Sequence, residues 1–185
     1  MKQRTLKDSI RATGIGLHSG VKVYMTLRPA PPNSGIIFRR IDLDAPVDIP
    51  ANATRVTQTT LGTTIQQDQV KVATVEHLLS AMAGLGIDNA FVDVTAPEVP
   101  IMDGSAKVFV DYIEESGIIN QKKDRKSIMV LKEVLVEEND SYVKIRPNNQ
   151  FSINIEIDFP SKIINHQSCK SVSYTHLTLP TNREV

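Results

Sequence analysis

Apolar and polar residues alternate along much of the chain, which predicts a largely β structure. Alternation or β-branched content marks these stretches as strands: residues 21–28, 35–40, 57–64, 88–94 and 151–159. A strand pair interrupted near Lys7 and Asp8 is expected within residues 2–13. Residues 128–136 and 142–145 predict a hairpin around residues 138–140.

Helical spacing replaces this alternation near the middle of the chain. Apolar residues three or four positions apart form one stripe that we expect to be buried: Val75, Leu78, Leu79, Met82 and Leu85. Thr74 is the expected N-cap, and Gly84 and Gly86 signal the helix end. Glu76 and His77 fall outside the stripe. Both side chains are therefore expected to project from the first turn, away from the core.

A second helix is expected to begin near Ser105. Its apolar stripe consists of Val108, Phe109, Tyr112 and Ile113, and Gly117 closes it. Two helices among several strands predict an α+β fold, with a small sheet packed on the two helices.

A polar segment predicts where one domain ends. Residues 120–126 are charged and lack an apolar period, so we expect a surface linker there. It would separate a first α+β domain, residues 1–124, from the opening strands of an incomplete second domain, residues 125–170. Residues 171–185 do not continue the preceding period and resemble a translated adapter sequence, so we expect a non-native tail.

Charge and cysteine content narrow the class of protein. The chain has 21 Lys and Arg and 21 Asp and Glu residues, so its net charge favours neither nucleic acid nor an anionic membrane as partner. The single cysteine, Cys169, excludes an intramolecular disulfide and fits a reducing compartment. No signal-peptide core or membrane-length apolar run is present, so we expect a cytoplasmic protein.

Glu76 and His77 are the first candidates for chemistry. The free N–H groups and dipole of a helix start favour a carboxylate and disfavour an imidazolium, so His77 is expected to be neutral. Neutral imidazole binds metal, and an ionised Glu beside it can take a proton from metal-bound water. The alternative is an ordinary surface pair. The spacing matches neither HExxH nor another self-contained zinc motif.

Three other segments offer side chains to a site. The glycine-rich residues 13–20 predict a tight loop around His18, which either serves a site or hydrogen-bonds its own turn. Thr60 and Leu61 lie in the threonine-rich stretch, which either brings hydroxyls to a site or only forms a strand. Asp103 either orients a loop beside the Glu-His helix or is a turn and cap residue.

Four motifs together resemble one enzyme family. They are GIGLHSG at 14–20, TVEHL at 74–78, GLGIDN at 84–89 and VPIMDGSA at 99–106. In this order and with these gaps they look like the UDP-3-O-acyl-N-acetylglucosamine deacetylase of lipid A biosynthesis. The resemblance implies two similar α+β domains, each a small sheet on two helices, with the active site between them.

The resemblance also implies an activity and roles for individual residues. The expected protein is a zinc-dependent amide hydrolase of Gram-negative bacteria that removes the acetyl group from a UDP-linked, 3-O-acylated glucosamine. His77 matches the first zinc ligand and Glu76 the general base, which accepts a proton from water activated by zinc. Residues matching segments beside the metal or substrate are Leu17, His18, Thr60 and Leu61, and Asp103 belongs to a supporting loop.

The sequence departs from the family pattern at its end. The remaining zinc ligands and the general acid of the family have no match here, and His166, Cys169 and His176 do not replace them. We therefore expect the N-terminal portion of the enzyme, inactive by itself. The alternative is a non-catalytic sugar-nucleotide-binding or interaction module with the same first-domain fold. Acyl-chain preference and oligomeric state do not follow from the sequence.

Overall fold

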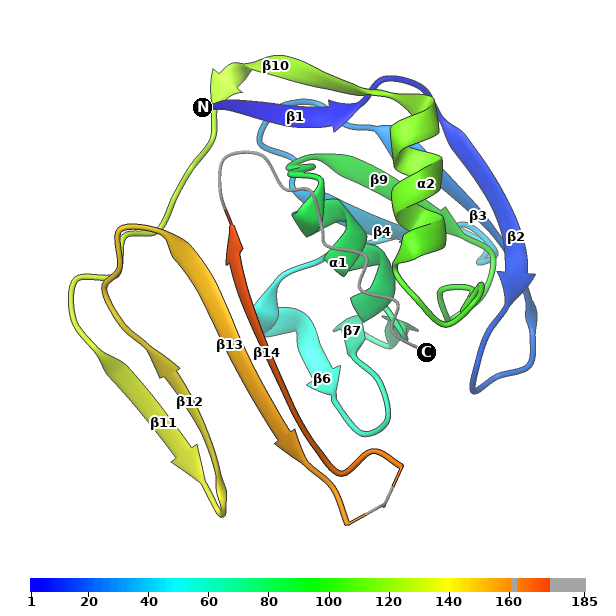
Figure 1. The fold of residues 1–185 in the computed structure, drawn as a ribbon. Helices are drawn as coiled ribbons and strands as arrows, with labels where there is room; N and C mark the ends of the chain where they lie inside the picture. The colour runs from blue at the N-terminus through cyan, green and yellow to red at the C-terminus, as the bar shows by residue number, and fades with distance from the viewer. Residues whose placement is uncertain (161–162, 174–185) are drawn as a thin grey trace. The chain divides into compact units, whose positions relative to one another are not determined.

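The computed structural model describes residues 1–160 and 163–173, and it divides the chain into two compact units. The first unit is residues 1–125, and the second begins at Lys126. Residues 161–162 and 174–185, which include His176, lie outside the described part (Figure 1).

The first unit is built on a five-stranded mixed sheet with strand order β2-β3-β9-β4-β5. Its strands are β2 (Ile10–Ile15), β3 (Lys22–Pro29), β4 (Ile36–Arg40), β5 (Val47–Pro50) and β9 (Ala90–Val94). Only β4 and β9 run parallel among its pairs. Alternating burial along β3 confirms the predicted period of two, because one face of the strand packs on the core.

Two helices lie over one face of this sheet: α1 (Glu76–Gly84) and α2 (Lys107–Ser116) (Figure 1). Leu78 and Met82 of α1 and Phe109 and Ile113 of α2 join the sheet residues in one buried core. Both predicted stripes thus supply buried residues, and the predicted α+β fold of a small sheet on two helices is confirmed. Gly117 ends α2 with a φ of 83°, as expected for a glycine at this position.

The expected linker at 120–126 is instead largely a strand. Strand β10 (Ile118–Asp124) pairs antiparallel with β1 (Lys2–Leu6), so the two ends of the first unit lie together. The strands predicted within residues 2–13 both exist, but they do not pair with each other, because β2 pairs with β3. The charged side chains of β10 misled the prediction, since an edge ribbon tolerates them on its exposed face.

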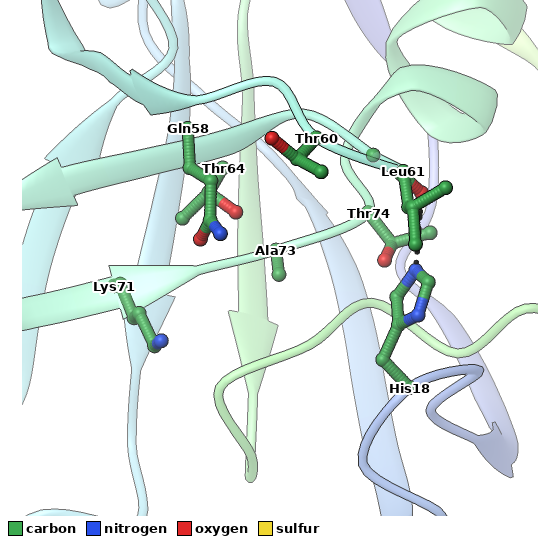
Figure 2. Close-up of a pocket in the computed structure, with 9 residues that line it drawn as sticks. His18, Gln58, Thr60, Leu61, Thr64, Lys71, Ala73 and Thr74 are labelled. Atoms are coloured by element: carbon green, nitrogen blue, oxygen red, sulfur yellow. Dashed lines mark hydrogen bonds between the residues drawn. The ribbon is translucent and has the colours of Figure 1, made fainter.

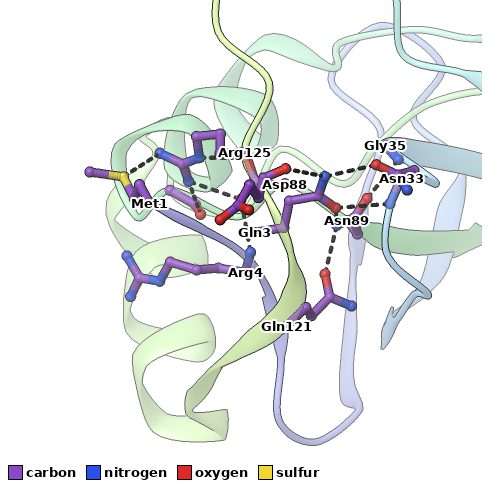
Figure 3. A network of polar contacts seen from close by, with 11 residues as sticks. Met1, Gln3, Arg4, Asn33, Gly35, Asp88, Asn89, Gln121 and Arg125 are labelled. Carbon is purple, nitrogen blue, oxygen red and sulfur yellow. Dashed lines mark hydrogen bonds and ion pairs between the residues drawn. The ribbon is translucent and has the colours of Figure 1, made fainter.

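A network of buried and half-buried amide side chains holds this ribbon to the sheet (Figure 3). The side-chain nitrogen of Asn89 donates to Oε1 of Gln3 at 2.9 Å and to Oε1 of Gln121 at 2.7 Å. Its oxygen accepts from the backbone of Gly35 at 2.9 Å. Arg125 follows the ribbon, with Nε 2.8 Å from Asp88 Oδ1 and Nη2 donating to the carbonyl of Gly86.

The threonine-rich stretch forms a turn between short strands and not the single strand expected for 57–64. A 3-10 turn, η1 (Ala53–Arg55), leads into a small sheet of β6 (Val56–Gln58), β7 (Thr64–Gln67) and β8 (Val70–Val72). Leu61 in the turn has a φ of 60°, which a continuous strand does not allow. The turn faces the start of α1, which makes it part of the candidate site.

Within its described residues, 126–160 and 163–173, the second unit contains two antiparallel strand pairs. Strands β11 (Val134–Glu138) and β12 (Ser141–Ile145) form the predicted hairpin, although its first strand begins at Val134 and not at Ile128 as expected. Strand β13 (Phe151–Asp158) pairs with β14 (His166–Ser173). Residues 171–173, expected to belong to a tail outside the fold, therefore pair as part of β14. Neither helix in the described residues is long and apolar enough to span a membrane.

Candidate functional site

Helix α1 begins at Glu76, so the Glu-His pair occupies its first turn as predicted. The expected N-cap at Thr74 is wrong, because Val75 is the cap residue and no side chain caps the helix. Thr74 has a φ of 56°, a left-handed conformation that is unusual for a β-branched residue. Its hydroxyl is used elsewhere: it donates to Oε1 of Glu98 at 2.9 Å.

Glu98 is a buried carboxylate, 2% exposed, that accepts four hydrogen bonds. The backbone of His18 donates to Oε1 at 3.0 Å, and Ser19 donates to Oε2 through its backbone at 2.9 Å and its hydroxyl at 2.7 Å. Burial alone raises the pKa of Glu98, but these hydrogen bonds outweigh it and lower the pKa to about 2. The group is therefore ionised at neutral pH, with no cation paired to it among the described residues.

The loop that carries His18 is held against this carboxylate. A Cβ at Gly16 would overlap the Glu98 carboxylate and the Ser19 hydroxyl, so glycine is required for the close approach. The ring of His18 is exposed, and its Nε2 lies 3.1 Å from the carbonyl oxygen of Leu61. His18 thus bridges its loop to the 59–63 turn and does not bond only within its own turn.

The 59–63 turn also contacts the Glu-His helix. The backbone N–H of Thr63 donates to Oε2 of Glu76 at 3.0 Å, and its carbonyl accepts from the backbone of Val75 at 3.3 Å. Gly62 lies between three side chains. A Cβ there would be 3.4 Å from Glu76 Oε1, 3.6 Å from His18 Nε2 and 3.7 Å from Thr74 Oγ1. The fold therefore brings His18, Thr74 and Glu76 around one glycine.

A hollow of about 290 Å³ opens beside this cluster (Figure 2). Its lining residues come from the His18 loop, the 59–63 turn and the strands that flank it: His18, Gln58, Thr60, Leu61, Gly62, Thr64, Lys71, Ala73 and Thr74. Hydroxyl, amide, imidazole and ammonium groups among them can bind the oxygens of a polar ligand. Figure 2 shows His18 and Leu61 at one end of the hollow and Lys71 at the other.

The remaining predicted site residues stand apart from the hollow. His77 is half-buried and forms no hydrogen bond or ion pair through its side chain with another described residue. Leu17 is 56% exposed on the His18 loop, whereas Leu61, which does line the hollow, is 83% exposed on the turn. No three His, Cys, Asp or Glu side chains in the described ranges converge as a metal site.

Asp103 is a turn residue in this structure. Its Oδ1 accepts from the backbone and the hydroxyl of Ser105, each at 2.9 Å, within an exposed turn that precedes α2. These bonds lower the pKa of Asp103 below its ordinary value. Of the two alternatives open from the sequence, its observed contacts are those of a turn residue, but Asp103 does not cap α2, whose cap position is Ala106.

Sequence reasoning missed Glu98, Lys71, Gln58 and Thr64 as residues of this region. Lys71, Gln58 and Thr64 lie on short strands whose pairing the sequence did not predict. For Glu98 a signal was present: the acid stands in the apolar run Ala96-Pro97-Glu98-Val99-Pro100, where a charge is expected to be buried and satisfied. Its partners lie 24 and about 80 residues away in sequence, so only the fold identifies them.

The fold and site define the class of protein: an α+β protein with a carboxylate, two imidazoles and a hollow gathered around the start of a helix. The family model for UDP-3-O-acyl N-acetylglycosamine deacetylase matches residues 3–178. The chain belongs to this family, which confirms the resemblance inferred from its four motifs.

Relatives of this family are more than half identical to the chain. A protein of Chromohalobacter salexigens is 56% identical over 167 residues, which are 90% of this chain and 55% of the relative. One of Teredinibacter turnerae is 57% identical over 159 residues, or 86% of this chain and 52% of the relative. Each is named UDP-3-O-acyl-N-acetylglucosamine deacetylase. The chain spans about half the length of the curated relatives it matches.

Proposed function

We propose that this chain carries part of the active site of a zinc-dependent deacetylase that hydrolyses the acetamide of UDP-3-O-acyl-N-acetylglucosamine in lipid A biosynthesis. The names of its relatives support the reaction. The observation that carries the proposal is the arrangement of Glu76, His18 and Thr74 around Gly62, at the edge of a hollow lined in part by hydroxyl, amide and ammonium groups. A cytoplasmic location in a Gram-negative bacterium is part of the same proposal.

Glu76 has the role of general base in this proposal. Its Oε2 is fixed by the Thr63 N–H, and its Oε1 makes no hydrogen bond to another described residue. Oε1 is therefore available to accept a proton from the water that attacks the acetamide carbonyl. The side chains proposed to contact the substrate are Leu17, His18, Thr60 and Leu61. Asp103 supports the site from the turn before α2.

His77 is the proposed metal ligand, but the described residues do not complete a zinc site. A catalytic zinc takes three protein ligands and keeps one open position. No such group converges in the part of the chain that the structure describes. We therefore propose that the other ligands belong to a further C-terminal part that the 185 residues do not contain.

The test uses the complete reading frame, purified as wild type, Glu76→Ala and His77→Ala. Zinc content is measured by elemental analysis, and the turnover rate is measured with the UDP-sugar as substrate. Glu76→Ala should keep the metal and lose about 10²- to 10⁴-fold in rate, because only the base is removed. His77→Ala should lose most of the metal. The 185-residue chain should lose its zinc to a mild chelator and show no turnover.

A control and a contrary result complete this test. Glu115→Gln, on the exposed face of α2, should leave rate and metal unchanged. A complete protein without zinc whose binding of the UDP-sugar persists in Glu76→Ala would instead favour a non-catalytic sugar-nucleotide-binding module. Activity of Glu76→Ala within about twofold of wild type would contradict its role as base.

A further inference from the structure

Three segments of the candidate site are linked, directly or through a neighbour, to one buried group that belongs to none of them: Glu98. The segments are the His18 loop, the 59–63 turn and the entry into α1. Glu98 bonds the first and third segments directly, and His18 and Glu76 in turn contact the second. We propose that Glu98 is a positioning residue, whose carboxylate fixes where His18 and Glu76 stand relative to each other. Its catalytic consequence rests on the proposed function, but its structural consequence does not.

The carboxylate is matched to its donors oxygen by oxygen. Oε1 accepts from the His18 backbone and the Thr74 hydroxyl, and Oε2 accepts from both donors of Ser19. A carboxylate accepts at both oxygens, whereas an amide replaces one acceptor with a donor. Glutamine at this position would set an NH₂ group against at least one N–H of the loop. Only the acid satisfies both segments at once.

The entry into α1 needs this restraint because its backbone is strained. Thr74 is 3% exposed and has a φ of 56°, which β-branched residues rarely adopt. Strain of this kind persists only where the surroundings over-determine it. Ala73 is held on the same side: its N–H donates to the Pro97 carbonyl at 2.9 Å, and its carbonyl accepts from Val99 at 3.0 Å. The segment around Glu98 therefore sets the backbone immediately before Glu76.

The first experiment follows the backbone N–H of Thr63, which bonds Glu76 and makes no contact with Glu98. Amide exchange by NMR on the 185-residue chain compares wild type with Thr74→Val, which removes the hydroxyl, and Thr74→Ser, which keeps it. We expect Thr63 to lose protection by about tenfold or more in Thr74→Val and to retain it in Thr74→Ser. Protection within about twofold of wild type in both variants would overturn the proposal.

The second experiment measures turnover of the UDP-sugar by the complete protein with Glu98→Gln. A displaced general base lowers kcat with little effect on substrate binding, so we expect kcat to fall by about 10- to 100-fold and KM to change less than about threefold. A raised KM at unchanged kcat, or no change in either constant, would contradict positioning. If Glu98→Gln does not fold, Ser19→Ala removes a single donor to Oε2 and is measured in the same way.

The two experiments separate this inference from the proposed function. If the wild-type complete protein does not turn over the UDP-sugar, the proposed function fails. Exchange at Thr63 then still decides whether Glu98 positions Glu76. Thr74→Ser is the matched control of the first experiment. Glu115→Gln is the matched control of the second, because it also converts a carboxylate to an amide but on an exposed helix face.

Discussion

At the scale of single residues, the acids of this site differ in what donates to them. Glu76 receives one N–H, Asp103 is bonded within its own turn, and Glu98 receives donors from two distant segments. The sequence predicted Glu76 and His77 because helical periodicity places them outside an apolar stripe. It could not predict the role of Glu98, since the donors reach that acid only through tertiary structure.

Glu98 should make stability depend on pH in acid. Its pKa is lowered from 4.5 in the unfolded chain to about 2 in the fold. The resulting stability, on the order of 3 kcal/mol, is fully present above pH 4.5 and is lost as the pH falls through about 2. Urea unfolding of wild type and Glu98→Gln should therefore show a free-energy difference that narrows between these values. A difference that stays constant over this range would show that ionisation of Glu98 does not stabilise the fold.

Asn89 should be intolerant of an isosteric change. Its NH₂ group donates to two glutamine oxygens, and the residue is 1% exposed. Asn89→Asp would place a carboxylate oxygen against both glutamine oxygens. We therefore expect the free energy of unfolding, measured with urea, to fall by about 2–4 kcal/mol. Asn52→Asp is the control, because its oxygen only accepts, from Thr54, at an exposed position. Equal stability of the two variants would argue against the network.

At the scale of elements, period and glycine placement predicted both helices and most strands, because those segments pack one face on a core. The incorrect predictions concern segments whose structure depends on contacts with residues distant in sequence. Strand β10 looks like a linker by composition, and it is a strand because β1 is available to pair with it. The threonine-rich stretch has strand propensity, yet Leu61 and Gly62 turn there to approach Glu76 and His18.

The end of α2 depends on a glycine conformation. Gly117 has φ 83° and ψ 159°, a region that essentially only glycine occupies. Gly117→Ala should therefore lower the free energy of unfolding by about 1–3 kcal/mol, measured by urea titration. The control is Glu115→Ala, at an exposed position two residues earlier, which should change the free energy of unfolding by less than about 0.5 kcal/mol. If Gly117→Ala leaves the free energy of unfolding unchanged, strand β10 can follow α2 with another backbone conformation at residue 117.

At the scale of the whole molecule, the two units differ in how they treat apolar residues. The first buries a continuous core between sheet and helices. In the second, alternate residues of β13 remain exposed although they are large and apolar: Phe151, Ile153, Ile155 and Ile157. Strands of this kind need a covering layer, and exposed ones favour association.

The first unit should fold without the second. Residues 1–125 should unfold cooperatively in urea and remain monomeric in sedimentation, because their core is complete. The 185-residue chain should associate with increasing concentration through its exposed strands. A gradual, non-cooperative transition of residues 1–125 would mean that the first unit needs the second. Loss of association after Ile153→Lys and Ile155→Lys would locate the contact on β13.

The pairing of β1 with β10 has a consequence for synthesis on the ribosome. Strand β1 emerges first, but its ribbon partner is the last strand of the unit to be made. Until residues 118–124 leave the exit tunnel, Lys2–Leu6 present an open strand edge, and Gln3 lacks its acceptor at the Asp124 carbonyl. A nascent chain paused before residue 118 therefore keeps this edge unpaired and open to association, and the first unit can close only once residues 118–124 have left the tunnel.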